Sequence, residues 1–193
     1  MTAEERREQI LDATKAIVTD RGFHAVSIEA VARGAGITRP IVYSHFGDLQ
    51  GLLEALVERE SRRALAQLSA VLPTDLGGGD PRAILLSAQR GYLEVVASDP
   101  DTWRLLLMPT EGAPAILRER IAGGRAAVVA QLAQAVAAGL GEARSPDPEL
   151  TAHMLSATSD ADARLLLDDP EGYPVERLLA HTRWILDQFR FGD

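Results

Sequence analysis

Several features are missing from this 193-residue sequence, and each absence narrows what the chain can do. It has no cysteine, which excludes disulfides and thiolate metal sites. Its first residues, MTAEERREQI, lack the basic stretch and following apolar run of a secretory signal peptide. The longest uncharged stretch, residues 126–141, falls short of the ~18 apolar residues that a membrane-spanning helix needs. We therefore expect a soluble, cytoplasmic protein with no membrane partner.

Motifs of enzyme chemistry are also missing. The sequence contains no nucleophile elbow, Walker loop, dinucleotide fingerprint or HExxH pair. The nearest approach to a metal-ligand set is His153 with Asp160 and Asp162, with Glu149 one turn before the histidine. Asp160, however, is one residue short of the eight-residue spacing that would return it to the face of His153. We predict no enzyme, no cofactor and no metal, and metal binding stays a minor alternative.

Positive charge is scarce as well, because the formal net charge is −8. The balance is uneven: residues 1–50 carry six cations and seven carboxylates, and the acidic excess lies in the remainder. A near-neutral head can still bind DNA if its cations share one face. Of the twenty cations only Lys15 is a lysine.

Helical periodicity dominates what is present, while alternating β-branched runs are rare. Capping and turn residues predict helices at about 2–20, 28–34, 38–46, 48–72, 81–98, 100–108, 114–140, 148–168 and 174–190. The linkers LPTDLGGGDP and GEARSPDP interrupt the series. We predict an all-α fold with a three-helix head, residues 1–47, and a larger helical body, residues 48–193.

The segment AGITRPIVYSHFG, residues 35–47, indicates what the head does. A short Gly-containing turn joins the second and third helices, as a helix-turn-helix requires. Val42 and Phe46 share an apolar face with Ile37, which predicts packing against the first helix. The other side chains of the third helix are left for a ligand, and a helix of this length fits the DNA major groove.

In these motifs the sequence resembles the tetracycline-repressor (TetR) family of bacterial regulators. The resemblance runs from about Ile10 to Leu56 and rests on ILDAT, GFHAVSIEAVARGAGIT, YSHF and LLEALVER. It implies a homodimer that binds a palindromic double-stranded operator, usually to repress, and releases it when a small molecule enters the body. The matching positions give the DNA-binding candidates Ser27, Thr38, Arg39, Pro40, Ile41, Tyr43, Ser44 and His45.

Arg39 is the candidate for a base contact, since a guanidinium donates twice to guanine. Ser27, Tyr43 and His45 fall where the family contacts phosphates, and Ile41 is placed to meet a thymine methyl. Two positions depart from the family pattern: Glu29 replaces a frequent arginine, and Leu49 replaces a frequent lysine. Both changes weaken phosphate attraction, so we expect either modest DNA affinity or compensation by Arg6, Arg7 and Arg33. A helix-turn-helix protein that acts through a protein partner stays as the alternative.

The body is predicted to dimerise and to bind the effector. Its last two helices carry apolar and small residues at helical spacing, which suits pairing into a four-helix bundle across a two-fold axis. The dimer candidates are Leu150, Ala157, Ala161, Leu165, Leu178, Thr182, Ile185 and Phe189. Aromatic and methionine side chains with polar handles predict a pocket for an apolar or aromatic ligand, lined by Tyr92, Trp103, Leu106, Leu107, Met108, Met154 and Thr158.

Overall fold

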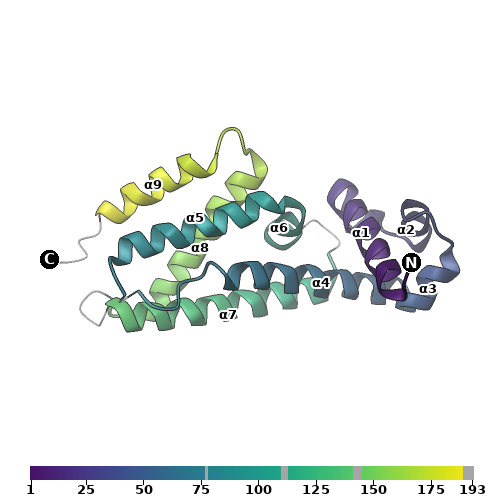
Figure 1. Ribbon diagram of the computed structural model, residues 1–193, viewed down its shortest axis with the longest axis horizontal. Coiled ribbons are helices and arrows are strands. Elements are labelled where there is room, and N and C mark those ends of the chain that lie inside the picture. The colour runs from purple at the N-terminus through teal and green to yellow at the C-terminus, as the bar shows by residue number, and fades with distance from the viewer. Residues whose placement is uncertain (77, 110–112, 141–144, 189–193) are drawn as a thin grey trace. The chain divides into compact units, whose positions relative to one another are not determined.

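The computed structural model describes residues 1–76, 78–109, 113–140 and 145–188, and every regular element within them is helical (Figure 1). The all-α prediction is confirmed. Contacts between Cα atoms divide the chain into two compact units. Unit 1 comprises Met1–Ala64 and Asp101–Ala122, and unit 2 comprises Leu65–Pro100 and Gly123–Asp193.

Unit 1 contains the predicted three-helix head. Its elements are α1 (Ala3–Arg21), the 3-10 turn η1 (Phe23–Ala25), α2 (Ile28–Gly34), α3 (Arg39–Phe46), the first part of α4 (Leu49–Ser69), nearly all of α6 (Pro100–Leu107) and the start of α7 (Ala115–Leu140). Unit 1 therefore reaches beyond the 1–47 head, because α4 and α6 contribute to its core. The division into a head that binds DNA and a body that senses a ligand stays a functional prediction.

Local sequence explains the ends of the head helices. Thr2 and Glu5 form a capping box at the start of α1. The Glu5 amide donates to the Thr2 hydroxyl at 3.1 Å, and the Thr2 amide donates to the Glu5 carboxylate at 2.7 Å. Gly36 adopts the positive φ of 65° expected in the turn before α3. Glycine there lets the chain reverse without strain, which sets the angle between α2 and α3.

The core of unit 1 is formed by buried apolar side chains from each of its helices. Ile10, Val31, Val42 and Leu52 have no exposed surface, and Phe23 is buried at 5% exposure. The remaining buried members are Leu11, Ile17, Val18, Val26, Ile28, Ala32, Leu56, Val57, Leu105 and Leu117. The predicted packing of Val42 with the first helix is confirmed, and Phe23 lies in the same buried cluster.

Unit 2 is built from α5 (Pro81–Ser98), α8 (Pro148–Asp168), α9 (Val175–Gln188), the end of α4 and the rest of α7. Helix α5 packs against both α8 and α9. Leu93 and Val96 of α5 are fully buried, as are Ala135 and Val136 of α7. Helix α7 runs through Gly123 and Gly124 without the interruption that the two glycines suggested.

Helix α7 is long and apolar enough, by length and composition alone, to cross a membrane. The sequence estimate missed this because it measured only the uncharged stretch. The side chains of α7 nevertheless enter protein cores. Leu117 is fully buried in unit 1, and Val129 and Val136 are buried in unit 2. One side of α7 therefore packs against protein, while 22% of its apolar window is buried.

Candidate nucleic-acid interface

The third helix is anchored along one side and open along the other. Val42 is fully buried, and Ile37 and Phe46 pack partly buried against the same core. The turn before α3 is fixed by the Ile37 amide, which donates to the carbonyl of Ala32 at 2.9 Å. A second bond comes from α1, where the Gln9 amide group donates to the carbonyl of Ala35 at 2.9 Å. These contacts hold α3 in a defined orientation.

The open side of α3 carries most of the predicted DNA-binding residues. Thr38, Arg39, Pro40, Tyr43 and Ser44 are exposed, and Tyr43 is exposed by 50%. Thr38 is the N-cap of α3, but its side chain makes no capping hydrogen bond. The Thr38 residue is exposed, and its hydroxyl does not bond to the backbone at the helix end.

Two members of the set are less open than predicted. Ile41 is half-buried and packs against the core of unit 1. The helical period explains this, since Ile41 lies between the core residue Val42 and the half-buried turn residue Ile37. His45 is also half-buried, with its ring centroid 6.1 Å from that of Phe46. The Ser44 hydroxyl donates to the carbonyl of Ile41 at 2.8 Å.

Ser27 caps α2 as predicted. Its hydroxyl accepts from the amide of Ala30 at 3.1 Å and remains exposed. Glu29, in the first turn of α2, forms a 2.9 Å ion pair with Arg33 one turn later. This pairing uses an arginine that would otherwise attract phosphate. Leu49 packs partly buried against the core of unit 1, so that position contributes packing and no charge.

The junction of α3 and α4 is tightly built. The Asp48 carboxylate accepts from the amide of Gly51 at 2.8 Å, which caps the start of α4. A side chain at Gly51 would collide with the carbonyl oxygen of Phe46. Glycine therefore permits the close approach of the first turn of α4 to the end of α3. The orientation of α3 is consequently fixed at both of its ends.

A buried ionic cluster joins α1, α4 and α6 in unit 1. The sequence did not predict it. The Glu60 carboxylate of α4 is fully buried and lies 2.9 Å from the Lys15 ammonium of α1. The Thr102 hydroxyl of α6 donates to Glu60 at 2.5 Å and accepts from Lys15 at 2.6 Å. Arg59 completes the cluster with a 2.8 Å contact to Glu60. The one feature of the sequence that could have indicated this cluster is Lys15, the only lysine among twenty cations.

The cluster keeps Glu60 ionised. Burial alone would raise the pKa of the Glu60 carboxyl. Hydrogen bonds from Thr102 and Lys15, with the charges of Lys15 and Arg59, outweigh that effect and hold the pKa below its ordinary value. Arg59 also contacts Glu8 at 2.9 Å and Asp12 at 2.8 Å on α1. The cluster thus joins α1, α4 and α6 through charge.

Comparisons with known proteins agree with this arrangement. Residues 10–56 match the family model described as bacterial regulatory proteins, tetR family. The chain is 25% identical to a TetR-like transcriptional regulator from Rhodococcus sp. RHA1, with a TM-score of 0.74 over 97% of both chains. The chain is thus similar to the tetR family model over residues 10–56 and to a solved TetR-like regulator over 97% of its length. A second TetR-family structure from Rhodococcus sp. shares 28% identity, with a TM-score of 0.72 over 96% of this chain and 98% of that one.

Curated TetR-like relatives match over a shorter length. The activator FasR of Mycolicibacterium smegmatis is 29% identical over 53% of this chain and 46% of its own length. The regulator AlkX of Mycobacterium tuberculosis is 31% identical over 58% and 57%, respectively. The chain therefore matches only about half the length of these relatives. Their names describe transcriptional regulators.

The predicted effector residues are divided between the units. Trp103 is buried in unit 1 at 3% exposure, with Leu106 and Leu107 half-buried and Met108 exposed. Tyr92 is buried in unit 2, and its hydroxyl donates to Asp160 at 3.2 Å. Burial raises its pKa far above the ordinary value, and the nearby Asp160 charge adds to the shift.

Two predicted lining residues do not face the interior of unit 2. Met154 is 64% exposed on α8, and the Thr158 hydroxyl is exposed and donates to the carbonyl of Met154 at 2.9 Å. They lie four residues apart, so both point from the same outer face of α8. Both side chains therefore lie outside the interior of unit 2, and their contact with a ligand stays a prediction.

Four of the eight predicted dimer residues lie on that outer face. Leu150 is 57% exposed and Leu165 is 39% exposed, while Ala157 and Ala161 are exposed between them. On α9, Thr182 and Ile185 are half-buried. Leu178 is buried at 5% exposure, because the face of α9 that it occupies is covered within unit 2. It supports the fold of the unit rather than a surface. Phe189 lies outside the described residues.

The acidic residues considered as metal ligands serve the packing of unit 2. Asp160 lies 2.6 Å from Arg125 in addition to its bond from Tyr92. Asp162 accepts from the Gln89 side chain at 2.8 Å. Within the described ranges, no group of three or more histidine, aspartate or glutamate side chains is placed to hold a metal ion.

Proposed function

We propose that this chain is a DNA-binding transcriptional regulator that reads duplex DNA with α3. The observation that supports this most directly is the division of α3 into a buried side at Val42 and an exposed side from Thr38 to Ser44. A helix anchored along one side can insert the other into a major groove about 12 Å wide. The tight junctions at both ends would keep it in register.

In this proposal the exposed residues divide between bases and backbone. Arg39 and the free Thr38 hydroxyl stand at the N-terminal end of α3, where recognition helices contact bases. Tyr43 and His45 stand toward its C-terminal end, where they would contact phosphates. Ser27 can contact a phosphate while it caps α2, because its hydroxyl is exposed. Phosphate contacts fix the register, and base contacts at Arg39 supply the sequence preference.

We further propose that two copies bind a palindromic operator. The exposed stripe of Leu150, Met154, Ala157, Ala161 and Leu165 on α8 supports this, because its spacing keeps all five side chains on one helix face. Such a face suits a second copy of itself across a two-fold axis. Two heads would then present half-sites about 34–36 Å apart, or a multiple of that distance.

The proposed signal is a small apolar or aromatic molecule bound by the body. A ligand that binds better when the two heads are wrongly spaced lowers operator affinity by its differential binding. We expect the outcome to be derepression. FasR is named as an activator, so a reporter assay with and without the effector should establish the direction in this chain.

The primary test is DNA binding by the purified chain. Fluorescence anisotropy should be measured with operator-length duplex from the upstream region of its own gene, at two salt concentrations. We expect sequence-specific, salt-sensitive binding that Arg39→Ala and Tyr43→Ala each abolish or strongly weaken. Absence of binding by folded, dimeric protein would contradict the proposal.

That negative result would favour the alternative, in which a helix-turn-helix protein acts through a protein partner. The Glu29–Arg33 ion pair and the packed Leu49 are the observations behind this alternative, because both remove cations from the head's surface. Restoring cations with Glu29→Arg and Leu49→Lys should then create DNA binding that the native chain lacks.

Effector binding has its own optical readout. Trp103 is buried and Trp184 is 58% exposed, so Trp184→Phe leaves one buried reporter. We expect apolar aromatic compounds to change the emission of Trp103 in that variant. If no compound in a broad apolar screen does so, the proposed effector class loses its support.

A further inference from the structure

The cations of the head fall into two groups. Three of the six in residues 1–50 are matched by a carboxylate within ion-pair distance. The pairs are Lys15–Glu60 at 2.9 Å, Arg21–Asp20 at 3.4 Å and Arg33–Glu29 at 2.9 Å. A cation already neutralised in this way contributes less to phosphate attraction.

The other three cations are Arg6, Arg7 and Arg39. Among the residues that the structure describes, none of the three has a carboxylate within 4.0 Å. Arg39 is on α3 itself and already belongs to the proposed DNA-reading set. Arg6 and Arg7 are on α1, which carries none of the residues proposed above for DNA contact.

Arg6 is held beside the turn that precedes α3. Its guanidinium donates to the side-chain oxygen of Gln9 at 2.7 Å, and Gln9 in turn donates to the carbonyl of Ala35 at 2.9 Å. Gln9 uses both ends of its amide, so it fixes the Arg6 side chain relative to the helix-turn-helix turn. The bond to Gln9 is neutral at the acceptor and leaves the positive charge of Arg6 uncompensated.

Arg7 is held at the opposite end of α3. Its guanidinium carbon lies 4.7 Å from the ring centroid of Phe46, the last residue of that helix. A cation over an aromatic face is attracted to the ring and loses part of its side-chain freedom. Both Arg6 and Arg7 are half-buried, which further limits where their charged groups can lie.

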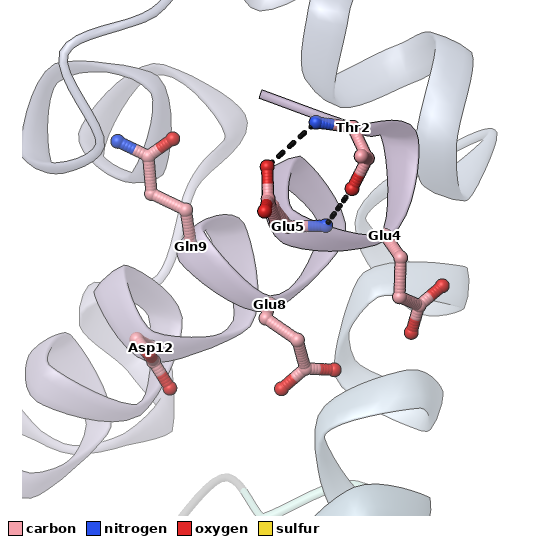
Figure 2. A pocket seen from close by; sticks show the side chains of 6 residues that line it. All are labelled: Thr2, Glu4, Glu5, Glu8, Gln9 and Asp12. Atoms are coloured by element: carbon pink, nitrogen blue, oxygen red, sulfur yellow. Dashed lines mark hydrogen bonds between the residues drawn. The ribbon is translucent and has the colours of Figure 1, made fainter.

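The carboxylates of α1 occupy a different face. A shallow pocket on α1 is lined by Thr2, Glu4, Glu5, Glu8, Gln9 and Asp12 (Figure 2). Gln9 points away from Glu4 and Glu8 in this view. Arg6 instead precedes the buried Ile10 by one helical turn, on the face that packs toward α2 and α3. The acidic face would repel a phosphate backbone, and the face with Arg6 and Arg7 would attract one.

We propose that Arg6 and Arg7 bind DNA phosphates on either side of the segment read by α3, with Gln9 as the positioning residue for Arg6. This inference rests on the proposed DNA-binding function and adds α1 to the interface. The two arginines supply the attraction for the DNA phosphates that Glu29 and Leu49 do not. Because phosphates are common to all sequences, Arg6 and Arg7 set affinity and register, while Arg39 keeps the sequence preference.

The salt dependence of DNA binding tests the proposal. The probe is a fluorescein-labelled duplex selected by the wild-type chain from a random-sequence library, titrated between 50 and 200 mM salt. Each phosphate contact contributes about 0.9 to the slope of log affinity against log salt. Arg6→Ala and Arg7→Ala should each reduce the slope by about 1, and the double variant by about 2. Arg6→Gln is a second variant in case Arg6→Ala folds poorly.

Arg21→Ala is the matched control. It removes the same charge from the same helix, but from the end where Arg21 is exposed and paired with Asp20. We expect its slope to equal that of the wild type. An equal loss of slope in Arg21→Ala would show that net charge alone is responsible and would overturn the proposal.

A double-mutant cycle tests the role of Gln9. Gln9→Leu should weaken DNA binding in the wild-type background and have no further effect when Arg6 is already alanine. A purely structural role at Ala35 would instead weaken binding equally in both backgrounds, which would contradict the positioning role. Thermal unfolding of each variant separates this outcome from loss of fold.

Two remaining outcomes are distinct. Wild-type binding with slopes unchanged by Arg6→Ala and Arg7→Ala would overturn this inference and leave the proposed function standing. Failure of the wild-type chain to select any duplex would overturn both.

Discussion

At the scale of single residues, Gly51 is a position in α4 where a side chain would not fit. A Cβ atom there would meet the Phe46 carbonyl oxygen, which is backbone and cannot rotate away. We expect Gly51→Ala to destabilise the chain by about 1–3 kcal/mol, the usual cost of overpacking. Urea denaturation followed by circular dichroism measures this.

Gly34→Ala is the matched control for that prediction. Gly34 ends α2, and a Cβ atom there would lie 3.7 Å from the Cβ of Ala13, an ordinary contact. The substitution should therefore be neutral or stabilise the chain by up to about 1 kcal/mol. If Gly51→Ala proves as harmless as Gly34→Ala, the close approach of α4 to α3 is not a constraint.

At the scale of elements, the cluster of Lys15, Glu60 and Thr102 links three helices. Lys15→Met removes one partner but leaves Glu60 with Arg59 and Thr102. The loss should therefore be about 1.5–3 kcal/mol at pH 7, the contribution of a hydrogen bond to a charged group. Arg21→Met, an exposed change on the same helix, should stay within about 0.5 kcal/mol of the wild type.

The same variant should change how stability depends on pH. The pKa of Glu60 is lowered in the folded chain, so its contribution is complete above the ordinary value of 4.5 and is lost as the pH falls through the folded pKa. Removing Lys15 removes one cause of that lowering. The difference in unfolding free energy between wild type and Lys15→Met should therefore shrink between pH 7 and pH 3. A constant difference across this range would contradict the assignment.

The elements also show what sequence can and cannot predict. Helices α5 and α8 begin and end where predicted, since Asp80-Pro81 and Asp147-Pro148 supply an N-cap followed by proline at the first position. These signals are local. The Lys15–Thr102 bond spans 87 residues, and no periodic pattern encodes such a pairing. Lys15 is conspicuous in the sequence as the only lysine, but the sequence does not indicate that it pairs with Glu60 and Thr102.

The candidate site divides in the same way. The exposure of Arg39 and Tyr43 follows from the helical period and the burial of Val42, so the sequence was enough to predict it. Ile41 was misplaced because a position at the edge of a helix face is decided by its neighbours. Sequence pointed to Arg6 as a cation that could compensate for Glu29 and Leu49. It did not point to Gln9, because the role of Gln9 depends on where the turn at Ala35 lies, which is tertiary information.

At the scale of the whole molecule, a monomer of this chain would leave a continuous apolar stripe on α8 in water. Ala161 lies near its middle, flanked one turn away on either side by Ala157 and Leu165. We expect Ala161→Arg to convert a dimer into monomer, because a two-fold interface meets the new charge and bulk twice. Light scattering coupled to size-exclusion chromatography measures the mass directly.

The control for the dimer prediction is Ala83→Arg, an equally exposed alanine on α5. It should leave the mass unchanged. Because a palindromic operator engages two heads, Ala161→Arg should also weaken operator binding while thermal unfolding and circular dichroism show that the monomer remains helical. A wild-type chain that is monomeric at micromolar concentration would overturn the proposed dimer. An Ala161→Arg variant that remains dimeric would place the interface elsewhere. The exposed stripe on α8 would then need another partner.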